Sequence, residues 1–124
     1  MDWRSKVSVP GNQANCGSCW AWTTAATLEG LNAIYNNLSV PEKFSVQYLV
    51  DCDSGNYGCD GGWMLDAYSF VSRNGIVRES DYPGYSARKQ ACRDHTTPDQ
   101  KFYIDDMKEE DNVSNERMKV LVSK

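Results

Sequence analysis

The chain has 124 residues, 40% of them hydrophobic, with a formal net charge of −4 and a sequence pI of about 4.9. This length and composition suit one compact unit with a modest core, and the acidic balance argues against nucleic acid or an anionic membrane as the main partner. No apolar run approaches the length needed to cross a bilayer, so we expect no membrane-spanning segment.

The first 36 residues are predicted to form a loop followed by a buried helix. Residues 1–18 have no steady period and contain Pro10 and Gly11, which favours an extended loop. From Cys19 onward, apolar residues recur at intervals of three and four, which predicts a helix that ends near Asn36-Asn37. Ser18 is its predicted N-cap. The periodic positions are Ala21, Ala25, Leu28, Leu31 and Tyr35.

Two more helices are predicted, on either side of a glycine-rich loop. Residues 44–52 read as a short helix that Ser45 caps. Residues 53–62 contain four glycines, which predicts a tight irregular loop. The next helix is expected from residue 63 to a stop at Asn74-Gly75. Its apolar side is predicted to consist of Met64, Leu65, Tyr68 and Val71.

The remaining residues are predicted to contain one strand and one further helix. Residues 76–86 are expected to form turns and loop because aromatic, proline and glycine residues interrupt them. Residues 101–110 resemble a strand that includes Phe102 and Ile104, and residues 115–124 resemble a helix.

Five cysteines are the most informative residues in the composition. Two disulfides would leave one thiol over, and a leftover thiol in an oxidised protein is a candidate reactive group. Cys16 and Cys19 lie three positions apart, a spacing that zinc sites and redox dithiols share.

Zinc is the least favoured interpretation of this pair. A structural zinc site needs a second close pair of ligands, but six residues separate Cys52 from Cys59. The single histidine, His95, has no ligand partner nearby in the sequence. We therefore expect no metal and no cofactor.

A redox couple and a lone nucleophile remain as interpretations of Cys16 and Cys19. Redox C-x-x-C motifs follow a strand in a βαβ unit, whereas a loop is predicted here, so a thiol-disulfide redox protein is a remote alternative. A cysteine at a helix N-terminus lies near the positive end of the helix dipole, which favours the nucleophilic thiolate. Cys19 would then be the reactive sulfur and Cys16 a structural one. A buried, inert Cys19 is the other alternative.

Several motifs in the same order resemble papain-like cysteine proteases, the family of papain and the cathepsins. The sequence C-G-S-C-W at residues 16–20 is a signature of that family. The segments D-W-R (2–4), the run from Gln13 to Trp22, S-V-Q-Y-L-V-D-C-D (45–53) and G-C-D-G-G-W-M (58–64) also match its patterns. Trp22 stands where the family usually has phenylalanine. The resemblance covers nearly the whole chain and implies an α+β, papain-like fold.

The resemblance assigns roles to individual residues. It implies disulfides Cys16–Cys59 and Cys52–Cys92, with Cys19 free as the nucleophile that forms a thioester. Gln13 is implied to donate to the oxyanion from its side-chain amide. The residues that the resemblance places in substrate binding are Gly17, Tyr57, Gly61, Gly62, Trp63 and Met64.

The resemblance also divides the chain and defines what it lacks. Residues 1–100 are expected to form the helical left domain, and residues 101–124 the start of the β-rich right domain. The family's catalytic histidine and asparagine follow its cysteine by about 130–150 residues, beyond Lys124. His95 is read as a surface residue. We therefore expect a cysteine endopeptidase portion that is inactive alone, or alternatively a non-catalytic binding module.

The expected partners and location follow from the same interpretation. They are a peptide or protein substrate, together with the missing right-domain segment or a second copy of the chain. The disulfides and the resemblance imply a lysosomal, vacuolar or secreted protein.

Overall fold

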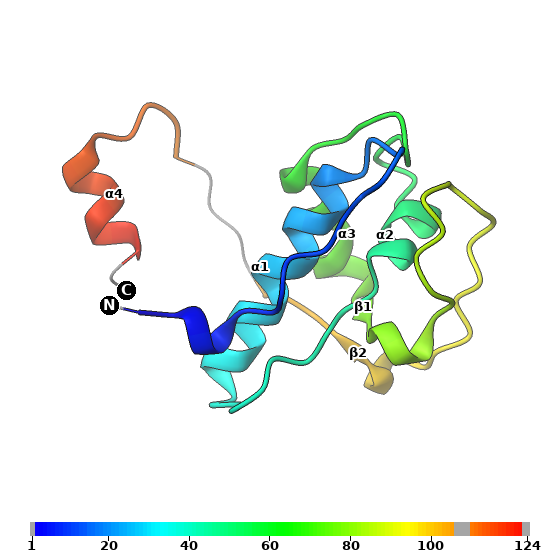
Figure 1. Cartoon of the computed structure of the whole chain (residues 1–124), viewed down its shortest axis with the longest axis horizontal. Coiled ribbons are helices and arrows are strands. Elements are labelled where there is room, and N and C mark those ends of the chain that lie inside the picture. Colours follow the sequence, from blue (N-terminus) through cyan, green and yellow to red (C-terminus); the bar gives the residue numbers. More distant parts are fainter. Residues whose placement is uncertain (1, 106–109, 123–124) are drawn as a thin grey trace.

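Helix α1 (Cys19–Tyr35) is the central element of the fold, and the two helices that follow it in the chain pack against it in a computed structural model that describes residues 2–105 and 110–122 (Figure 1). Helices α2 (Val46–Cys52) and α3 (Met64–Asn74) both contact α1. Strands β1 (Ile76–Val77) and β2 (Lys101–Phe102) form a two-stranded antiparallel sheet in which Ile76 is opposite Phe102. Short 3-10 turns cover Arg4–Lys6, Glu79–Asp81 and Pro98–Gln100.

The core forms where the apolar faces of these elements meet. Each fully buried large apolar side chain contributes about 1.5–3 kcal/mol relative to an exposed one. Tyr48 also stacks obliquely on Phe70, with ring centroids 5.8 Å apart, which joins α2 to α3. The principal core residues are Trp20, Ala21, Ala25 and Leu28 of α1, Tyr48, Leu49 and Val50 of α2, Ala67, Phe70 and Val71 of α3, and Ile76 and Val77 of β1.

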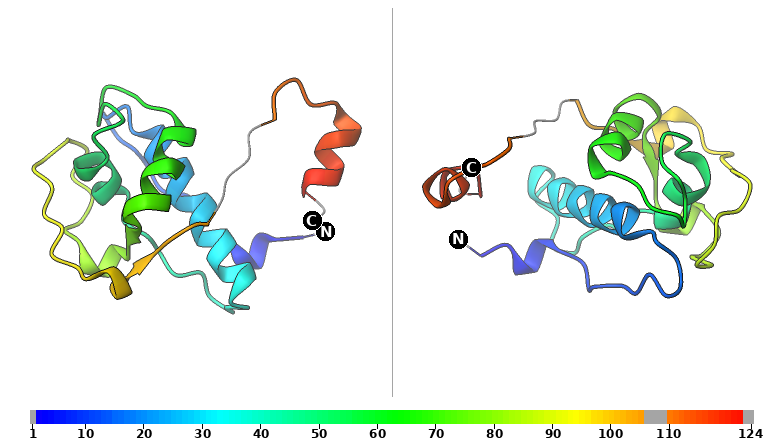
Figure 2. Two further views of the ribbon diagram at one scale, coloured as in Figure 1. Left: turned by 180° about the vertical axis from the view of Figure 1, so that it is seen from behind. Right: turned by 90° about the horizontal axis from the view of Figure 1, so that it is seen from above.

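The start of the N-terminal segment and α4 lie on the same side of the molecule (Figures 1 and 2). The segment before Cys19 runs back along α1, and its 3-10 turn at Arg4–Lys6 lies against that helix (Figure 2). Helix α4 (Asn115–Val122) lies apart from α2 and α3 in every view (Figures 1 and 2). Among the described residues, none of the helices has the length and apolar character required to span a membrane.

Two disulfides hold the loops to the helices. Cys16 is bonded to Cys59 and Cys52 to Cys92, with sequence separations of 43 and 40. These are the pairings that the family resemblance implied. In the chain-entropy account, each loop closure is worth up to about 4 kcal/mol.

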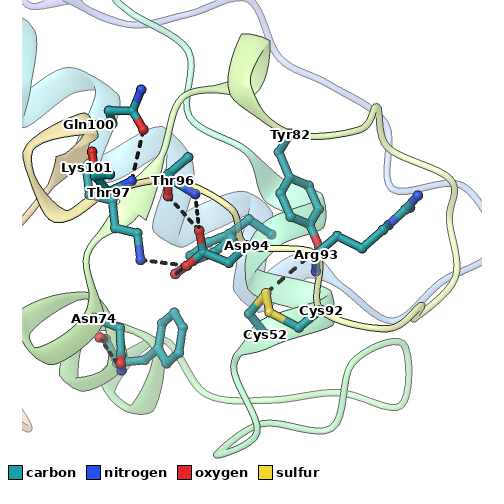
Figure 3. A network of polar contacts seen from close by, with 12 residues as sticks. Cys52, Asn74, Tyr82, Cys92, Arg93, Asp94, Thr96, Thr97, Gln100 and Lys101 are labelled. Atoms are coloured by element: carbon teal, nitrogen blue, oxygen red, sulfur yellow. Dashed lines mark hydrogen bonds and ion pairs between the residues drawn. A yellow bond between two sulfur atoms is a disulfide. The ribbon is translucent and has the colours of Figure 1, made fainter.

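The loop that Cys92 anchors is also fastened by polar contacts (Figure 3). Lys101 Nζ donates to Asp94 Oδ2 at 2.6 Å, and the backbone N–H of Thr96 donates to Asp94 Oδ1 at 3.1 Å. Tyr82 Oη donates to the buried carboxylate of Asp51 at 2.8 Å. Residues 82–94 are therefore held to α2 by a disulfide and a hydrogen bond, and to β2 by an ion pair.

The structure confirms the three predicted helices before residue 75 and corrects several local details. Ser45 caps α2, since its Oγ accepts the Tyr48 N–H at 3.0 Å, and Gly75 follows α3 with φ of 76°. Ser18 occupies the N-cap position of α1, but its side chain makes no capping hydrogen bond. The predicted position of the N-cap was therefore right, but the predicted hydrogen bond from the first turn to the Ser18 side chain is absent.

The predicted apolar faces and the predicted strand were also partly wrong. In α3, Val71 is buried and Tyr68 packs against the core, as predicted, whereas Met64 and Leu65 are each 38% exposed and Ala67 and Phe70 are buried in their place. In α1, Leu31 and Tyr35 are exposed, because Asn32 and Ala33 form the buried face of the last turns instead. Two elements were not predicted: a 3-10 turn at Arg4–Lys6 and a strand at Ile76–Val77. The strand expected over 101–110 comprises only Lys101–Phe102, and residues 106–109 of that range lie outside the described residues.

Candidate functional site

Cys19 combines a free thiol with a position at the start of a helix. All five cysteines lie within the described residues, and Cys19 is the one that forms no disulfide. Its side chain is exposed. As the first residue of α1, Cys19 also has a backbone N–H that no carbonyl of the helix can accept. A nucleophilic sulfur and a hydrogen-bond donor are thus available on one residue.

Gln13 is held by both its side chain and its backbone. Its side-chain Nε2 donates to the carbonyl of Cys16 at 2.9 Å, and its own carbonyl accepts the Tyr85 hydroxyl at 2.6 Å. A glutamine amide nitrogen carries two hydrogens, so one remains after the bond to Cys16. The amide is therefore oriented by the segment that the Cys16–Cys59 disulfide fixes, with one donor to spare.

Cys19 and Gln13 line the same cavity, which has a volume of about 400 Å³. One side of α1 forms its floor. Residues 8–11 of the N-terminal segment, Phe44–Gln47 and Tyr85 form its walls. The further lining residues from α1 are Trp22, Thr23, Ala25, Ala26 and Glu29.

A buried carboxylate lies at the far end of this cavity. Glu29 is 4% exposed, and its Oε1 accepts the Phe44 N–H at 3.0 Å. Burial raises the pKa of Glu29, and the hydrogen bond from Phe44 only partly opposes that effect.

The segment with Cys16 and the glycine-rich loop are joined edge to edge. The Gly17 N–H donates to the Cys59 carbonyl at 2.8 Å, and Gly17 forms a parallel bridge with Asp60. A Cβ at Gly17 would lie 2.6 Å from the Cys59 oxygen, so only glycine allows this approach. The loop is thereby fixed to the chain two residues before Cys19.

The predicted substrate-binding residues of the glycine-rich loop lie together, but outside the cavity of Cys19 and Gln13. Gly61 has φ of 112° and Gly62 packs against Asn56 and Trp20, so both positions require glycine. Trp20 is fully buried and its Nε1 donates to the Gly58 carbonyl at 3.0 Å, which supports the loop from below. Tyr57 and Trp63 are 70% and 71% exposed, and Met64 is 38% exposed.

A buried polar pair sets the conformation of this loop. Asn56 Nδ2 donates to Asp53 Oδ2 at 2.7 Å, and Asn56 Oδ1 accepts the Trp63 N–H at 2.8 Å. Asp53 is 2% exposed, and burial raises its pKa although Asn56 and the Gly55 N–H donate to it. The pair therefore links the start of the loop to its end.

The disulfide pattern removes two interpretations of the cysteine pair. Because Cys16 is bonded to Cys59, Cys16 and Cys19 do not form a redox couple. Among the described residues there is no group of three or more histidine, cysteine, aspartate or glutamate residues that could hold a metal ion. His95 is exposed, as predicted, and does not line the cavity of Cys19.

Sequence reasoning missed Tyr85 and Asn56. Tyr85 lies in the stretch predicted as turns and loop, and it contacts both Gln13 and Ser18 from 72 and 67 residues away in the chain. No local pattern predicts such a distant contact. Asn56 stood in a glycine-rich segment, where asparagine is expected for turn formation alone.

Comparison with known proteins identifies the family. The papain family cysteine protease model matches residues 1–124. The chain belongs to this family. It is 45% identical over 97 residues to a cathepsin L-like proteinase of Phaedon cochleariae, covering 75% of this chain and 29% of the relative. It is 42% identical over 106 residues to chymopapain of Carica papaya, covering 84% of this chain and 29% of that protein.

Solved structures of papain-family proteases share the fold. A Carica candamarcensis cysteine protease in complex with E-64 aligns with a TM-score of 0.75 at 36% identity, covering 85% of this chain and 49% of that one. The proform of the ragweed pollen allergen Amb a 11 aligns with a TM-score of 0.76 at 42% identity, covering 85% of this chain and 32% of that one. The chain thus spans less than half the length of these relatives.

Proposed function

We propose that this chain supplies the nucleophile, the oxyanion donors and one wall of the substrate cleft of a papain-like cysteine endopeptidase. The observation that carries the proposal is the free, exposed Cys19 at the start of α1, in one cavity with the side-chain amide of Gln13. Family membership gives this arrangement its chemical interpretation.

In the proposed reaction the Cys19 sulfur attacks the carbonyl carbon of a peptide bond. A C–S bond forms, and the electron pair of the C=O bond moves to the oxygen. The Gln13 amide and the Cys19 backbone N–H donate to this oxyanion. Collapse of the intermediate breaks the C–N bond, the departing amine takes up a proton, and water later hydrolyses the thioester.

The glycine-rich loop is the proposed binding surface for the substrate main chain. Gly61 and Gly62 lack side chains, so an extended peptide can approach their backbone and pair with it as a strand would. Tyr57, Trp63 and Met64 offer exposed apolar surface beside them for substrate side chains. Gly17 belongs to the same proposed surface because its backbone N–H donates a hydrogen bond to the Cys59 carbonyl of this loop.

The general base is proposed to come from outside these residues. The single histidine of the chain, His95, is exposed and outside the Cys19 cavity, so we propose that the 124-residue chain alone has negligible peptidase activity. Residues 1–100 are the proposed left domain and residues 101–124 the proposed start of a right domain. A right-domain segment or a second copy of this chain is the proposed partner. The two disulfides support a lysosomal, vacuolar or secreted location.

A peptide aldehyde tests the proposal without needing a general base. The thiol of Cys19 adds to the aldehyde: the C–S bond forms, the C=O double bond becomes single, and the thiol proton ends on oxygen. Binding of ¹³C-labelled acetyl-phenylalanyl-glycinal, followed by NMR, should show this adduct in the 124-residue chain. Gln13→Ala should weaken it by about 10-fold or more, because one donor to the oxygen is lost. Cys19→Ser should abolish it.

Alkylation by iodoacetamide is the matched control. That reaction displaces iodide and creates no oxyanion, so its rate in Gln13→Ala should equal that of the wild type. Equal aldehyde affinity in the wild type and in Gln13→Ala would contradict the assignment of Gln13. A chain that binds the peptide without forming the C–S bond would instead be a non-catalytic binding module.

A further inference from the structure

The hydroxyl group of Tyr85 links Gln13 to Ser18, the residue that precedes Cys19. Tyr85 Oη donates to the Gln13 carbonyl at 2.6 Å and lies 2.7 Å from the Oγ of Ser18, the residue before Cys19. A phenol has one hydrogen, and a carbonyl cannot donate. The proton assignment is therefore fixed: Ser18 donates to Tyr85, and Tyr85 donates to Gln13.

The surroundings hold the Tyr85 hydroxyl in place. Ser18 is fully buried, so its hydroxyl is shielded from bulk solvent. The ring of Tyr85 meets the ring of Trp22 edge to face, with centroids 5.0 Å apart. Tyr85 also lines the cavity that contains Cys19 and Gln13. One residue thus contacts the Gln13 loop, the residue that precedes the nucleophile and the first turn of α1.

The same contact explains why Ser18 does not cap α1. At an N-cap, a serine Oγ ordinarily accepts an N–H of the first turn, yet the Oγ of Ser18 makes no such bond. Its hydroxyl is directed to Tyr85 instead. The Ala21 and Trp22 N–H groups donate to the backbone carbonyl of Ser18, and no side chain caps the N–H groups of the first turn.

We propose that Tyr85 is a positioning residue for the oxyanion site: its hydroxyl fixes the distance between the Gln13 loop and the start of α1. This inference rests on the proposed function, since it assumes that Gln13 and Cys19 act on one oxygen. It adds a residue that does not touch the substrate. Loss of the hydroxyl should loosen Gln13 without changing the sulfur itself.

Tyr85→Phe tests the proposal, because it removes the hydroxyl and keeps the ring against Trp22. The acetyl-phenylalanyl-glycinal adduct should be about 3- to 10-fold weaker than in the wild type, the effect of one neutral hydrogen bond. The iodoacetamide rate at Cys19 should be unchanged. Tyr35→Phe is the matched control, since Tyr35 is 85% exposed at the C-terminal end of α1, away from Cys19. This variant should leave both measurements unchanged.

Ser18→Ala separates the two bonds of the Tyr85 hydroxyl. It leaves the bond from Tyr85 to Gln13 intact, so its effect on the adduct should be smaller than that of Tyr85→Phe. Equal adduct affinity in Tyr85→Phe and the wild type overturns the inference while the proposed function stands. A parallel fall in the iodoacetamide rate also overturns it, because that pattern indicates a general structural role. If the wild type forms no more adduct than Gln13→Ala, the proposed function and this inference both fail.

Discussion

The two disulfide-tied loops of this protein, residues 53–63 and residues 82–102, stabilise their carboxylates in opposite ways. In the first loop, the buried Asp53 accepts hydrogen bonds from neutral donors, Asn56 Nδ2 at 2.7 Å and the Gly55 N–H at 3.1 Å. In the second, Asp94 forms an ion pair with Lys101 at 2.6 Å. Burial dominates at Asp53 and raises its pKa. At Asp94, partial burial is outweighed by Lys101 and Thr96, which lower the pKa to about 2.

The difference matches what each loop contacts. Residues 53–63 pack on Trp20 and bridge to Gly17, so they are part of the surroundings of Cys19. Residues 82–102 reach the surroundings of Cys19 at Tyr85, and Tyr82 donates to Asp51 of α2. Their ion pair, between Asp94 and Lys101, lies away from that contact and holds the loop to β2 (Figure 3). Asp53, close to Gly17, is thus held by neutral hydrogen bonds, and Asp94, in the bracing part of the second loop, by an ion pair.

Removing one disulfide at a time gives the largest expected contrast between the loops. The double variants Cys16→Ala/Cys59→Ala and Cys52→Ala/Cys92→Ala open loops of nearly equal length, so each should lower the free energy of unfolding by about 2–4 kcal/mol. The first should weaken the peptide-aldehyde adduct more than the second, because it frees the segment that orients Gln13 directly, whereas the second can act on Gln13 only through Tyr85. Urea unfolding and the NMR assay measure the two effects. Equal losses of adduct affinity would show that the loops do not differ in function.

A single methyl group at Gly62 should produce the next largest effect. A Cβ there would lie 2.5 Å from Asn56 Oδ1 and 2.9 Å from Trp20 Cδ2, so Gly62→Ala should cost about 1–3 kcal/mol through overpacking. Gly84→Ala is the control in the other loop, because nothing lies within 4 Å of its Cβ. Its effect on the free energy of unfolding should stay within about 0.5 kcal/mol. A tolerant Gly62 would mean that Asn56 can move without cost.

Local sequence patterns predicted the helices and the position of Cys19 at the start of one, but not how distant segments meet. Ser45 and Gly75 act locally, so their capping and stop signals were readable. The pairing of the two disulfides could be predicted only from the resemblance to a family, since the spacing of the cysteines alone left it open. The bonds of Tyr85 to Gln13 and Ser18 depend on the fold bringing residues 67 to 72 positions apart together. The exposure of Met64 and Leu65 likewise depends on what covers α3.

Acid should weaken the ion pair between Asp94 and Lys101, with a smaller effect on the free energy of unfolding than the disulfide and Gly62 variants have. Its pKa of about 2 in the folded chain is below the ordinary value of 3.8, so its contribution is present above pH 4 and is lost as the pH falls toward 2. After allowance for solvent screening, we expect a loss of about 1–2 kcal/mol. Urea unfolding between pH 4 and pH 2 should show this loss in the wild type relative to Asp94→Asn. A constant difference between the two proteins would exclude the ion pair as a source of stability.

The contribution of Asp53 to the free energy of unfolding should change with pH in the direction opposite to that of Asp94. Because burial raises its pKa, the folded chain holds this proton more tightly than the unfolded chain, so the contribution of Asp53 is largest below its ordinary value of 3.8 and falls as the pH rises through its folded-state pKa. Relative to Asp53→Asn, the wild type should therefore lose stability as the pH rises above 4, where the Asp94 difference is flat. If both differences change in the same direction with pH, the neutral donors Asn56 and Gly55 compensate the buried charge fully. The contrast between the two loops would then lie in their contacts and not in their charge.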